Sequence, residues 1–265
     1  MNRVFVVDKP SGLTSHDVVA RVRRALRTRR VGHAGTLDPS ATGVLIVMVG
    51  KATRLAQFFM DCRKRYRGGI VLGTTTDTQD ADGKVLRVRP VGELSSEDVA
   101  EVLRRFTGEI EQVPPMVSAL KHEGTPLYVL ARRGQSVERI PRRVTIRKLR
   151  LLSLDLPKLE FEVECSRGTY VRTLANDIGE ELGTGAHLGE LTRTAVGPFE
   201  LAEAISLERL EDAAPEAEGL GYSMFDALPF LPEIRISDRE SERIATGGAV
   251  DLAEERIDGG EREEI

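Results

Sequence analysis

The chain has 265 residues, of which 40% are hydrophobic and 30% charged, proportions typical of a soluble globular protein. Its longest uninterrupted apolar run, Val44–Val49, is far too short for a membrane span, and the first residues contain no apolar stretch of the length of a secretory signal. The two cysteines, Cys62 and Cys165, match no metal-ligand spacing. These features predict a protein of the reducing cytoplasm.

The net charge of −4 conceals a strong asymmetry along the chain. Residues 1–150 contain 28 Lys and Arg against 15 Asp and Glu, whereas residues 151–265 contain 10 against 27. A basic part beside an acidic part indicates a polyanionic partner for the basic one. Composition alone supports ordinary solvated surface charge equally well.

The first hundred residues predict strands and helices in alternation. Residues 4–7 predict a buried strand, and residues 43–50 predict a second. Between them, residues 14–28 predict a helix with Thr14 or Ser15 as its cap. The apolar face of this helix consists of Val18, Val19, Val22 and Leu26. Residues 69–72 and 84–88 predict a pair of strands around a turn-rich segment.

The remaining elements are predicted by the same signals. Residues 95–108 predict a helix with a serine cap, and 144–154 and 159–165 predict strands, the second with strict alternation of apolar residues and glutamates. Residues 168–183 predict a helix that Thr169 caps and Gly183 ends. Because the regular βαβ rhythm is missing, we expect a mixed α+β fold.

Two segments near the end differ in composition from the rest. Residues 207–221 are acidic and are typical of a helix end followed by a linker. Residues 222–265 then predict a separate small module. The predicted division is therefore a main domain of residues 1–221 and a module of residues 222–265.

Three basic clusters lie in the first 150 residues: "RVRRALRTRR" at 21–30, "RKRYR" around Tyr66, and residues 131–150, which hold eight basic residues and one acid. The planar guanidinium group of arginine can form two hydrogen bonds to one phosphate, and a tyrosine ring among cations can stack on a nucleic acid base. Each cluster alone is equally typical of an ordinary solvent-exposed surface. The three clusters together favour a nucleic acid partner.

The common motifs of other function classes are missing. The sequence has no GxxxxGK[ST], no GxGxxG and no GxSxG, which argues against nucleotide triphosphates, dinucleotides and the usual serine hydrolases. Its four histidines (His16, His33, His122 and His187) form no HExxH or similar pair, so we expect no metal site.

The segment "RVGHAGTLDPSATGVLIVMVG" (30–50) places Asp38 in a loop of small residues, with His33 five residues upstream. An Asp-Pro pair usually starts a turn, and glycines often serve only the backbone. Here the small neighbours leave room for a flat ligand, and the following strand would hold the loop rigidly. Asp38 is therefore a candidate site residue.

The motif "GHAGTLDPSATGVL" resembles the catalytic motif of the TruB family of tRNA pseudouridine synthases, whose usual form is GHxGxLDPxAxGVL. Three further segments resemble that family's motifs in the same order: "VDKPSGLTSHDVV", "KRYRGGIVLGTTTDTQDADG" and "CSRGTYVRTLANDIGEELGTGAHLGELTRT". The resemblance covers about residues 4–199. It implies a mixed, largely antiparallel catalytic sheet flanked by helices, and an isomerase that converts uridine 55 of tRNA to pseudouridine without a cofactor.

The resemblance also implies the residues that carry the reaction. Asp38 is expected to be the nucleophile, and Arg172 is expected to lie opposite it and to counter the rise in pKa that burial causes. Asp80 is expected to hold the arginine or tyrosine network in place, although a turn-forming aspartate is a serious alternative. Without the resemblance, Arg172 would be read as a helix-surface arginine.

Further residues are expected to form the uridine pocket. Tyr66 is implied to stack on the target uracil and is counted with Asp38 and Arg172 as catalytic. Tyr170 is implied to be a pocket wall that assists proton transfer at C5. Leu191 is implied to be an apolar pocket contact, although an ordinary core leucine fits its pattern equally well. His33 is implied to occupy the space left by flipped-out bases.

The implied partner is the T-arm stem-loop of tRNA, with no membrane and no obligate protein partner, and the expected state is a monomer. Residues 122–145 correspond to the family's inserted "thumb". The resemblance implies a C-terminal PUA-like module, which here is reduced or incomplete. An RNA-binding protein or tRNA-folding chaperone, and a pseudouridine synthase for another RNA, are the alternatives.

Overall fold

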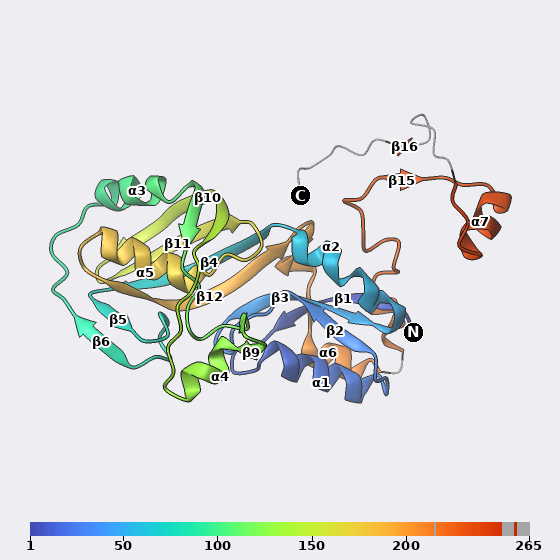
Figure 1. Ribbon diagram of the computed structural model, residues 1–265, viewed down its shortest axis with the longest axis horizontal. Helices are drawn as coiled ribbons and strands as arrows, with labels where there is room; N and C mark the ends of the chain where they lie inside the picture. The colour runs from blue at the N-terminus through green and yellow to red at the C-terminus, as the bar shows by residue number, and fades with distance from the viewer. Residues whose placement is uncertain (215, 251–256, 259–265) are drawn as a thin grey trace.

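The computed structural model describes residues 1–214, 216–250 and 257–258. As predicted, the fold is mixed α+β, with one large sheet and helices packed on it (Figure 1). Of the predicted module 222–265, residues 251–256 and 259–265 lie outside the described residues.

The large sheet has ten strands, and its main path runs in the order β14-β1-β3-β12-β4-β11-β10-β7, with β2 paired to β3 and β13 paired to β12. Their bounds are β1 Arg3–Lys9, β2 Val31–Ala34, β3 Thr42–Val49, β4 Lys64–Leu72, β7 Gly108–Gln112, β10 Arg142–Asp155, β11 Lys158–Cys165, β12 Ala186–Val196, β13 Phe199–Glu200 and β14 Ile205–Ser206. The β1–β14 and β3–β12 pairs are parallel, and the other pairs are antiparallel.

Three small two-stranded sheets complete the strands. They are formed by β5 Thr74–Thr76 with β6 Val85–Val88, by β8 Lys121–His122 with β9 Thr125–Pro126, and by β15 Glu233–Ile234 with β16 Ile257–Asp258. The first of these refutes one prediction: residues 84–88 pair with Thr74–Thr76 and not with 69–72. Gly73 separates β4 from β5 with a φ of +85°, a conformation that favours glycine.

Helices cover both halves of the sheet (Figure 1). Their bounds are α1 Ser15–Ala25, α2 Ala56–Asp61, α3 Ser96–Arg105, α4 Leu127–Arg132, α5 Val171–Glu181, α6 Leu207–Asp212 and α7 Asp238–Ala245, with 3₁₀ turns at Gly50–Leu55, Leu201–Glu203 and Ala217–Leu220. Helices α3 and α5 share one apolar core with β4, β10, β11 and β12. Helices α1 and α6 share a second with β1 and β3, and α2 lies over the other face of these two strands.

Capping signals explain two of the predicted helices well. Thr14 caps α1 and forms a capping box with Asp17, and Ser95 does the same for α3 with Asp98. The predicted cap of α5 is wrong. Tyr170 stands at its N-cap, because the Gln112 amide bonds both backbone groups of Tyr170, while the Thr169 hydroxyl donates to the Ser166 carbonyl.

The acidic stretch 207–221 packs more closely than a linker would. Leu207, Leu210 and Ala217 are buried in the core shared with α1. Beyond it, Tyr222 bonds the backbone of Val4, and residues up to Phe230 pack on the neighbouring core. The linker part of that prediction is therefore wrong, because these apolar side chains close the end of the sheet.

Candidate active site

Asp38 lies in the loop of residues 35–41 that joins β2 to β3. Gly43, at the start of β3, has a φ of +98°, and a Cβ at this position would lie 2.2 Å from the Arg193 carbonyl oxygen. Only glycine allows β3 and β12 to approach so closely beside the loop. The loop is thus held at the seam between two parallel strands in the middle of the sheet.

Two side chains from the N-terminal segment fasten this loop from one side. The Lys9 ammonium is fully buried and donates to the carbonyls of Pro10, Leu13 and Pro39 at 2.9, 2.7 and 3.1 Å. The Ser15 hydroxyl accepts from the Leu37 amide at 2.9 Å and bonds the carbonyl of the same residue at 3.2 Å. Burial lowers the pKa of Lys9 to about 8.

Arg193 fastens the same loop from the sheet. Its guanidinium is buried and donates to the Gly35 carbonyl at 3.0 Å and to the Val44 carbonyl at 2.7 Å. The same group lies beside the Tyr66 phenol, with which β12 pairs it across the sheet. One buried cation therefore links the aspartate loop to the ring expected to stack on the substrate.

The Asp38 carboxylate is paired with Arg172 on α5. Arg172 Nε lies 2.9 Å from Asp38 Oδ2, and its Nη1 lies 3.3 Å from Asp80 Oδ2. Arg172 also donates to the backbone carbonyls of Thr78 at 3.0 Å and Val117 at 2.9 Å. The Arg172 side chain is 5% exposed and that of Asp38 is 40% exposed. The cation is thus fixed by four partners, while the carboxylate keeps one side open.

This environment acts on the Asp38 carboxyl in two directions. Burial raises the pKa of Asp38 above its ordinary value, and the neighbouring Asp80 carboxylate adds to the rise. The Arg172 guanidinium and, to a smaller extent, Lys9 lower the same pKa. An ionised carboxylate in such a place is largely desolvated but paired with a cation, which suits a nucleophile.

Asp38 opens into a cavity of about 610 Å³ at the middle of the sheet. Its lining comes from the aspartate loop, from β4, β10 and β12, from the N-terminus of α5, and from residues 118–119. The lining includes Asp38, Lys64, Tyr66, Ser118, Arg142, Arg143, Arg167, Tyr170, Arg172, Leu191 and Arg193. Five of the seven predicted site residues therefore lie on one cavity: Asp38, Tyr66, Tyr170, Arg172 and Leu191.

The side chains of this cavity combine apolar walls with a basic rim. Tyr66 on β4 and Leu191 on β12 are both 9% exposed, and Leu191 pairs with Gly68, whose missing side chain leaves room beside it. Burial raises the pKa of both Tyr66 and Tyr170, so both phenols stay protonated at neutral pH. A flat uncharged ring flanked by phosphates would match this lining.

The other two predicted residues do not line the cavity. Asp80 reaches the site through its ion pair with Arg172. The His33 ring, on β2, makes an edge-to-face contact with His16 at 5.7 Å between ring centres. Burial lowers the pKa of His33 to about 4, which keeps the ring neutral at physiological pH.

Three residues of the site were missed in the sequence: Lys9, Lys64 and Arg193. Lys64 lines the cavity and donates to the carbonyls of Phe59, Met60 and Cys62. Each of the three stands at an inward position of a strand with apolar neighbours. A cation at such a position was a usable signal, because buried lysine and arginine require partners.

A search of the described residues finds no group of three or more His, Cys, Asp or Glu side chains that could hold a metal ion. In the same part of the chain, no helix has both the length and the apolar character needed to cross a bilayer.

Comparison with protein-family models matches two consecutive regions. Residues 23–171 match the model described as "TruB family pseudouridylate synthase (N terminal domain)". Residues 172–223 match "tRNA pseudouridylate synthase B C-terminal domain". The boundary between the two falls at the start of α5, between Tyr170 and Arg172 of the cavity.

Comparisons with individual proteins agree with these matches. The chain is 49% identical over 248 residues to tRNA pseudouridine synthase B of Syntrophotalea carbinolica, covering 93% of this chain and 81% of the relative. It is 50% identical over 250 residues to the protein of that name in Geobacter sulfurreducens, covering 93% and 82%. Among solved structures, a chain of a Cbf5-Nop10-Gar1 complex superposes with a TM-score of 0.74 at 31% identity, covering 96% of this chain and 69% of that one.

Proposed function

The chain belongs to the TruB family of pseudouridylate synthases, and we propose that it isomerises uridine 55 in the T-loop of tRNA to pseudouridine with Asp38 as the nucleophile. The relatives that it matches over most of their length are named tRNA pseudouridine synthase B. The enzyme class follows from that family, and the roles of individual residues are our proposal.

The observation that supports the role of Asp38 is its ion pair with Arg172 at the open side of the cavity. Pseudouridine formation breaks the N1–C1′ bond, turns the base and joins C5 to C1′. Attack at C1′, attack at C6 and assistance of a glycal route all begin with an ionised carboxylate close to the sugar. The Arg172 guanidinium lowers the pKa of Asp38 and so counters part of the rise that burial causes.

The walls of the cavity suit the rotating base. Tyr66 and Leu191, on neighbouring strands, offer largely apolar surface against which a uracil ring can be held and turned. Because the Tyr66 and Tyr170 phenols remain protonated, they add hydrogen-bond donors without a second negative charge beside Asp38. We propose that Tyr170 forms the pocket wall beside C5 and assists, by hydrogen bonding, the transfer of the C5 proton to water that completes the reaction.

The basic residues at the rim suit the RNA backbone. Arg142, Arg143 and Arg167 line the same cavity as Asp38, where they would neutralise phosphates next to an extruded nucleotide. The neutral ring of His33, beside His16, is the group that we expect to fill the gap in the RNA loop.

We further propose that the protein acts as a monomer in the cytoplasm, without an obligate protein partner or a cofactor. The ion pair, the stacking ring and the basic rim all come from one chain, so a single copy holds a complete site. Light scattering of the free protein and of its tRNA complex tests the monomer. We propose 1–221 as the catalytic domain, 122–145 as its thumb and 222–265 as a PUA-like module whose first residues, up to Phe230, pack on the catalytic domain.

Tritium release tests the reaction and the nucleophile together. In tRNA transcribed with 5-tritiated uridine, formation of the C5–C1′ bond releases the label into water. We expect release with the wild type and a loss of at least about 1000-fold with Asp38→Asn. Asp82→Asn is the matched control, because it removes an exposed carboxylate in the turn after β5 and should retain full release.

Binding is measured on the same samples so that the outcomes can be separated. Equal tRNA affinity of wild type and Asp38→Asn, with release only by the wild type, supports the proposal. Tight binding of tRNA without release by either protein would contradict it and would leave an RNA-binding or RNA-folding protein. Release of tritium from a ribosomal RNA fragment but not from a T-arm hairpin would show that the substrate is another RNA and not the T-arm of tRNA.

A further inference from the structure

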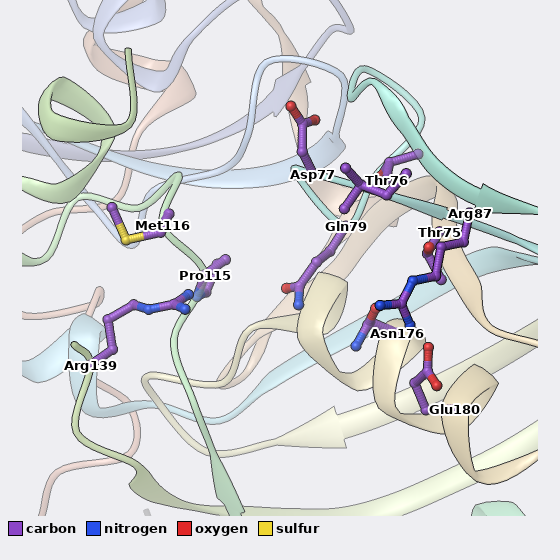
Figure 2. Close-up of a pocket in the computed structure, with 11 residues that line it drawn as sticks. Thr75, Thr76, Asp77, Gln79, Arg87, Pro115, Met116, Arg139, Asn176 and Glu180 are labelled. Atoms are coloured by element: carbon purple, nitrogen blue, oxygen red, sulfur yellow. The ribbon is translucent and has the colours of Figure 1, made fainter. Parts of the chain in front are cut away.

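A second cavity lies beside the catalytic one, between the β5–β6 hairpin, helix α5 and the segment that follows β7 (Figure 2). Its volume is about 350 Å³, which suits a single group of nucleoside size. The residues that line it are Thr75, Thr76, Asp77, Gln79, Leu86, Arg87, Pro115, Met116, Arg139, Asn176 and Glu180. None of them has a part in the proposed reaction.

Neighbouring residues of the chain line the second cavity and the catalytic one. Pro115 and Met116 line the second cavity, whereas Ser118 lines the first. Between them, the Val117 carbonyl accepts a hydrogen bond from Arg172. A nucleotide next to one bound in the first cavity would therefore have the second within its reach.

The lining of the second cavity combines amide side chains with apolar surface. Gln79 and Asn176 carry both hydrogen-bond donors and acceptors, and Figure 2 shows the Gln79 side chain extending into the space between Arg139 and Asn176. Leu86, Pro115 and Met116 supply apolar surface. Edge recognition by polar groups together with contacts to the flat faces is how proteins hold unstacked bases.

The charges of the lining argue against a phosphate as the occupant. The lining contains two cations, Arg87 and Arg139, and two carboxylates, Asp77 and Glu180, so it has no net excess of positive charge. A phosphate group would therefore gain no net electrostatic attraction from these four side chains. An uncharged base needs no such attraction, and it could still bond the guanidinium groups.

Gln79 itself is held in an unusual backbone conformation. Its φ is +64°, which few residues other than glycine adopt. The conformation is fixed because Gln79 accepts a hydrogen bond from the Thr173 hydroxyl at 2.9 Å, while its carbonyl accepts one from the Leu188 amide at 3.0 Å. Strained residues of this kind gather at ligand sites.

Arg139, on the opposite wall, is only partly used by the protein. One of its terminal nitrogens donates to the Pro114 carbonyl at 3.0 Å, and its buried Nε has no hydrogen-bond partner among the described residues. A small shift of this side chain would bring an unused donor to an acceptor in the cavity.

We propose that the second cavity binds an unpaired base of the substrate RNA that neighbours the target uridine. The inference rests on the proposed function, because it takes the substrate to be RNA. It adds a second point of recognition, in which the loop sequence next to the target contributes to affinity through Gln79 and Asn176.

A cycle of protein and RNA changes tests this proposal. A set of T-arm hairpins is synthesised, each with one abasic position in the loop outside the target. Their dissociation constants and single-turnover rates are measured with wild type, Asn176→Ala and Leu86→Ala. The matched control is Val88→Ala, since Leu86 and Val88 lie on the same strand and are 63% and 76% exposed, but only Leu86 lines the cavity.

At one loop position, we expect the abasic change to weaken binding to the wild type by about tenfold and to both cavity variants by less than about twofold. Val88→Ala should behave as the wild type does. Equal losses in all four proteins at every position would overturn the proposal. Tight binding without pseudouridine formation would instead refute the proposed function, and the binding cycle would still report on the cavity.

Discussion

The loop that carries Asp38 and the segment 113–141 that borders the same cavity are held in very different ways. The loop is fastened by buried side chains from three elements: Lys9 from β1, Ser15 from α1 and Arg193 from β12. The segment has two-residue strands, a six-residue helix, and exposed cations such as Arg132 and Arg133.

This difference separates two tasks of the molecule. A nucleophile, the role that we propose for Asp38, has to be held within a fraction of an ångström, and buried side chains fasten its loop accordingly. A segment that must accommodate an RNA loop has few buried contacts and a low cost of local rearrangement. We therefore expect changes around the Asp38 loop to reduce kcat and stability, and changes in the segment to raise KM.

Arg193→Met should give the largest effect. It leaves the buried carbonyls of Gly35 and Val44 without their donor, which costs about 3 kcal/mol of unfolding free energy and lowers Tm by roughly 10 °C. The displaced loop should reduce kcat by about 100-fold. Calorimetry and single-turnover kinetics measure the two effects.

The control for this variant is Thr194→Val, which changes the next residue on the opposite face of β12. It should stay close to the wild type in both measurements. Unchanged Tm and kcat in Arg193→Met would show that the loop holds its shape without the buried cation.

Ser15→Ala should have a smaller effect of the same kind. It removes the two bonds between the hydroxyl and the Leu37 backbone, at a cost of about 1–2 kcal/mol, and should slow the reaction about tenfold. Ser11→Ala is the comparison, because the exposed Ser11 hydroxyl bonds the Ser40 carbonyl of the same loop and its loss should change stability by less than about 0.5 kcal/mol. Equal effects of the two variants would contradict the importance of the buried bonds.

The sequence predicted much of the site around the Asp38 loop but little of the segment 113–141. The resemblance of the motif around Asp38 and of two later motifs to a known family predicted the cavity residues Tyr66, Arg172 and Leu191 from distant segments. The fastening cations were missed because helical and strand patterns assign inward positions to apolar residues. Yet Arg193 stands two residues after Leu191 on one buried face of β12, and that spacing was visible.

Other errors have local physical reasons. The cap of α5 could not be predicted from Thr169, because Gln112, far away in the chain, satisfies the backbone of Tyr170 instead. The partner of β6 was misplaced because the apolar run of β4 ends at Gly73, and the polar threonines after it form the strand β5 that pairs with β6. The segment after β7 has weak periodicity, so its short elements gave no usable signal.

Asp80→Asn should alter the pH dependence of the reaction more than its rate at neutral pH. The Asp80 carboxylate raises the pKa of Asp38, so its neutralisation should favour the ionised form and lower that pKa. Since the ionised form reacts, the acid limb of the single-turnover rate should move to lower pH. The loss of one Arg172 partner should also reduce the plateau rate a few-fold.

The exposed Asp82, two residues further on, is the control for this shift. Asp82→Asn should leave the acid limb where it is in the wild type. A shift of the Asp80→Asn limb to higher pH would show that Asp80 acts by orienting Arg172 and that its charge is of little consequence.

Arg133→Ala should give the smallest effect and should act on binding alone. Arg133 is exposed, in the residues that follow α4, so its loss should leave Tm unchanged. If it contacts a phosphate, KM should rise about threefold. The slope of log Kd against log salt concentration should then decrease by about one, the contribution of one phosphate contact. Salt titrations of tRNA binding measure that slope. A reduced kcat with an unchanged slope would instead mean that the segment acts in the chemical step, and the division of tasks between the two regions would not hold.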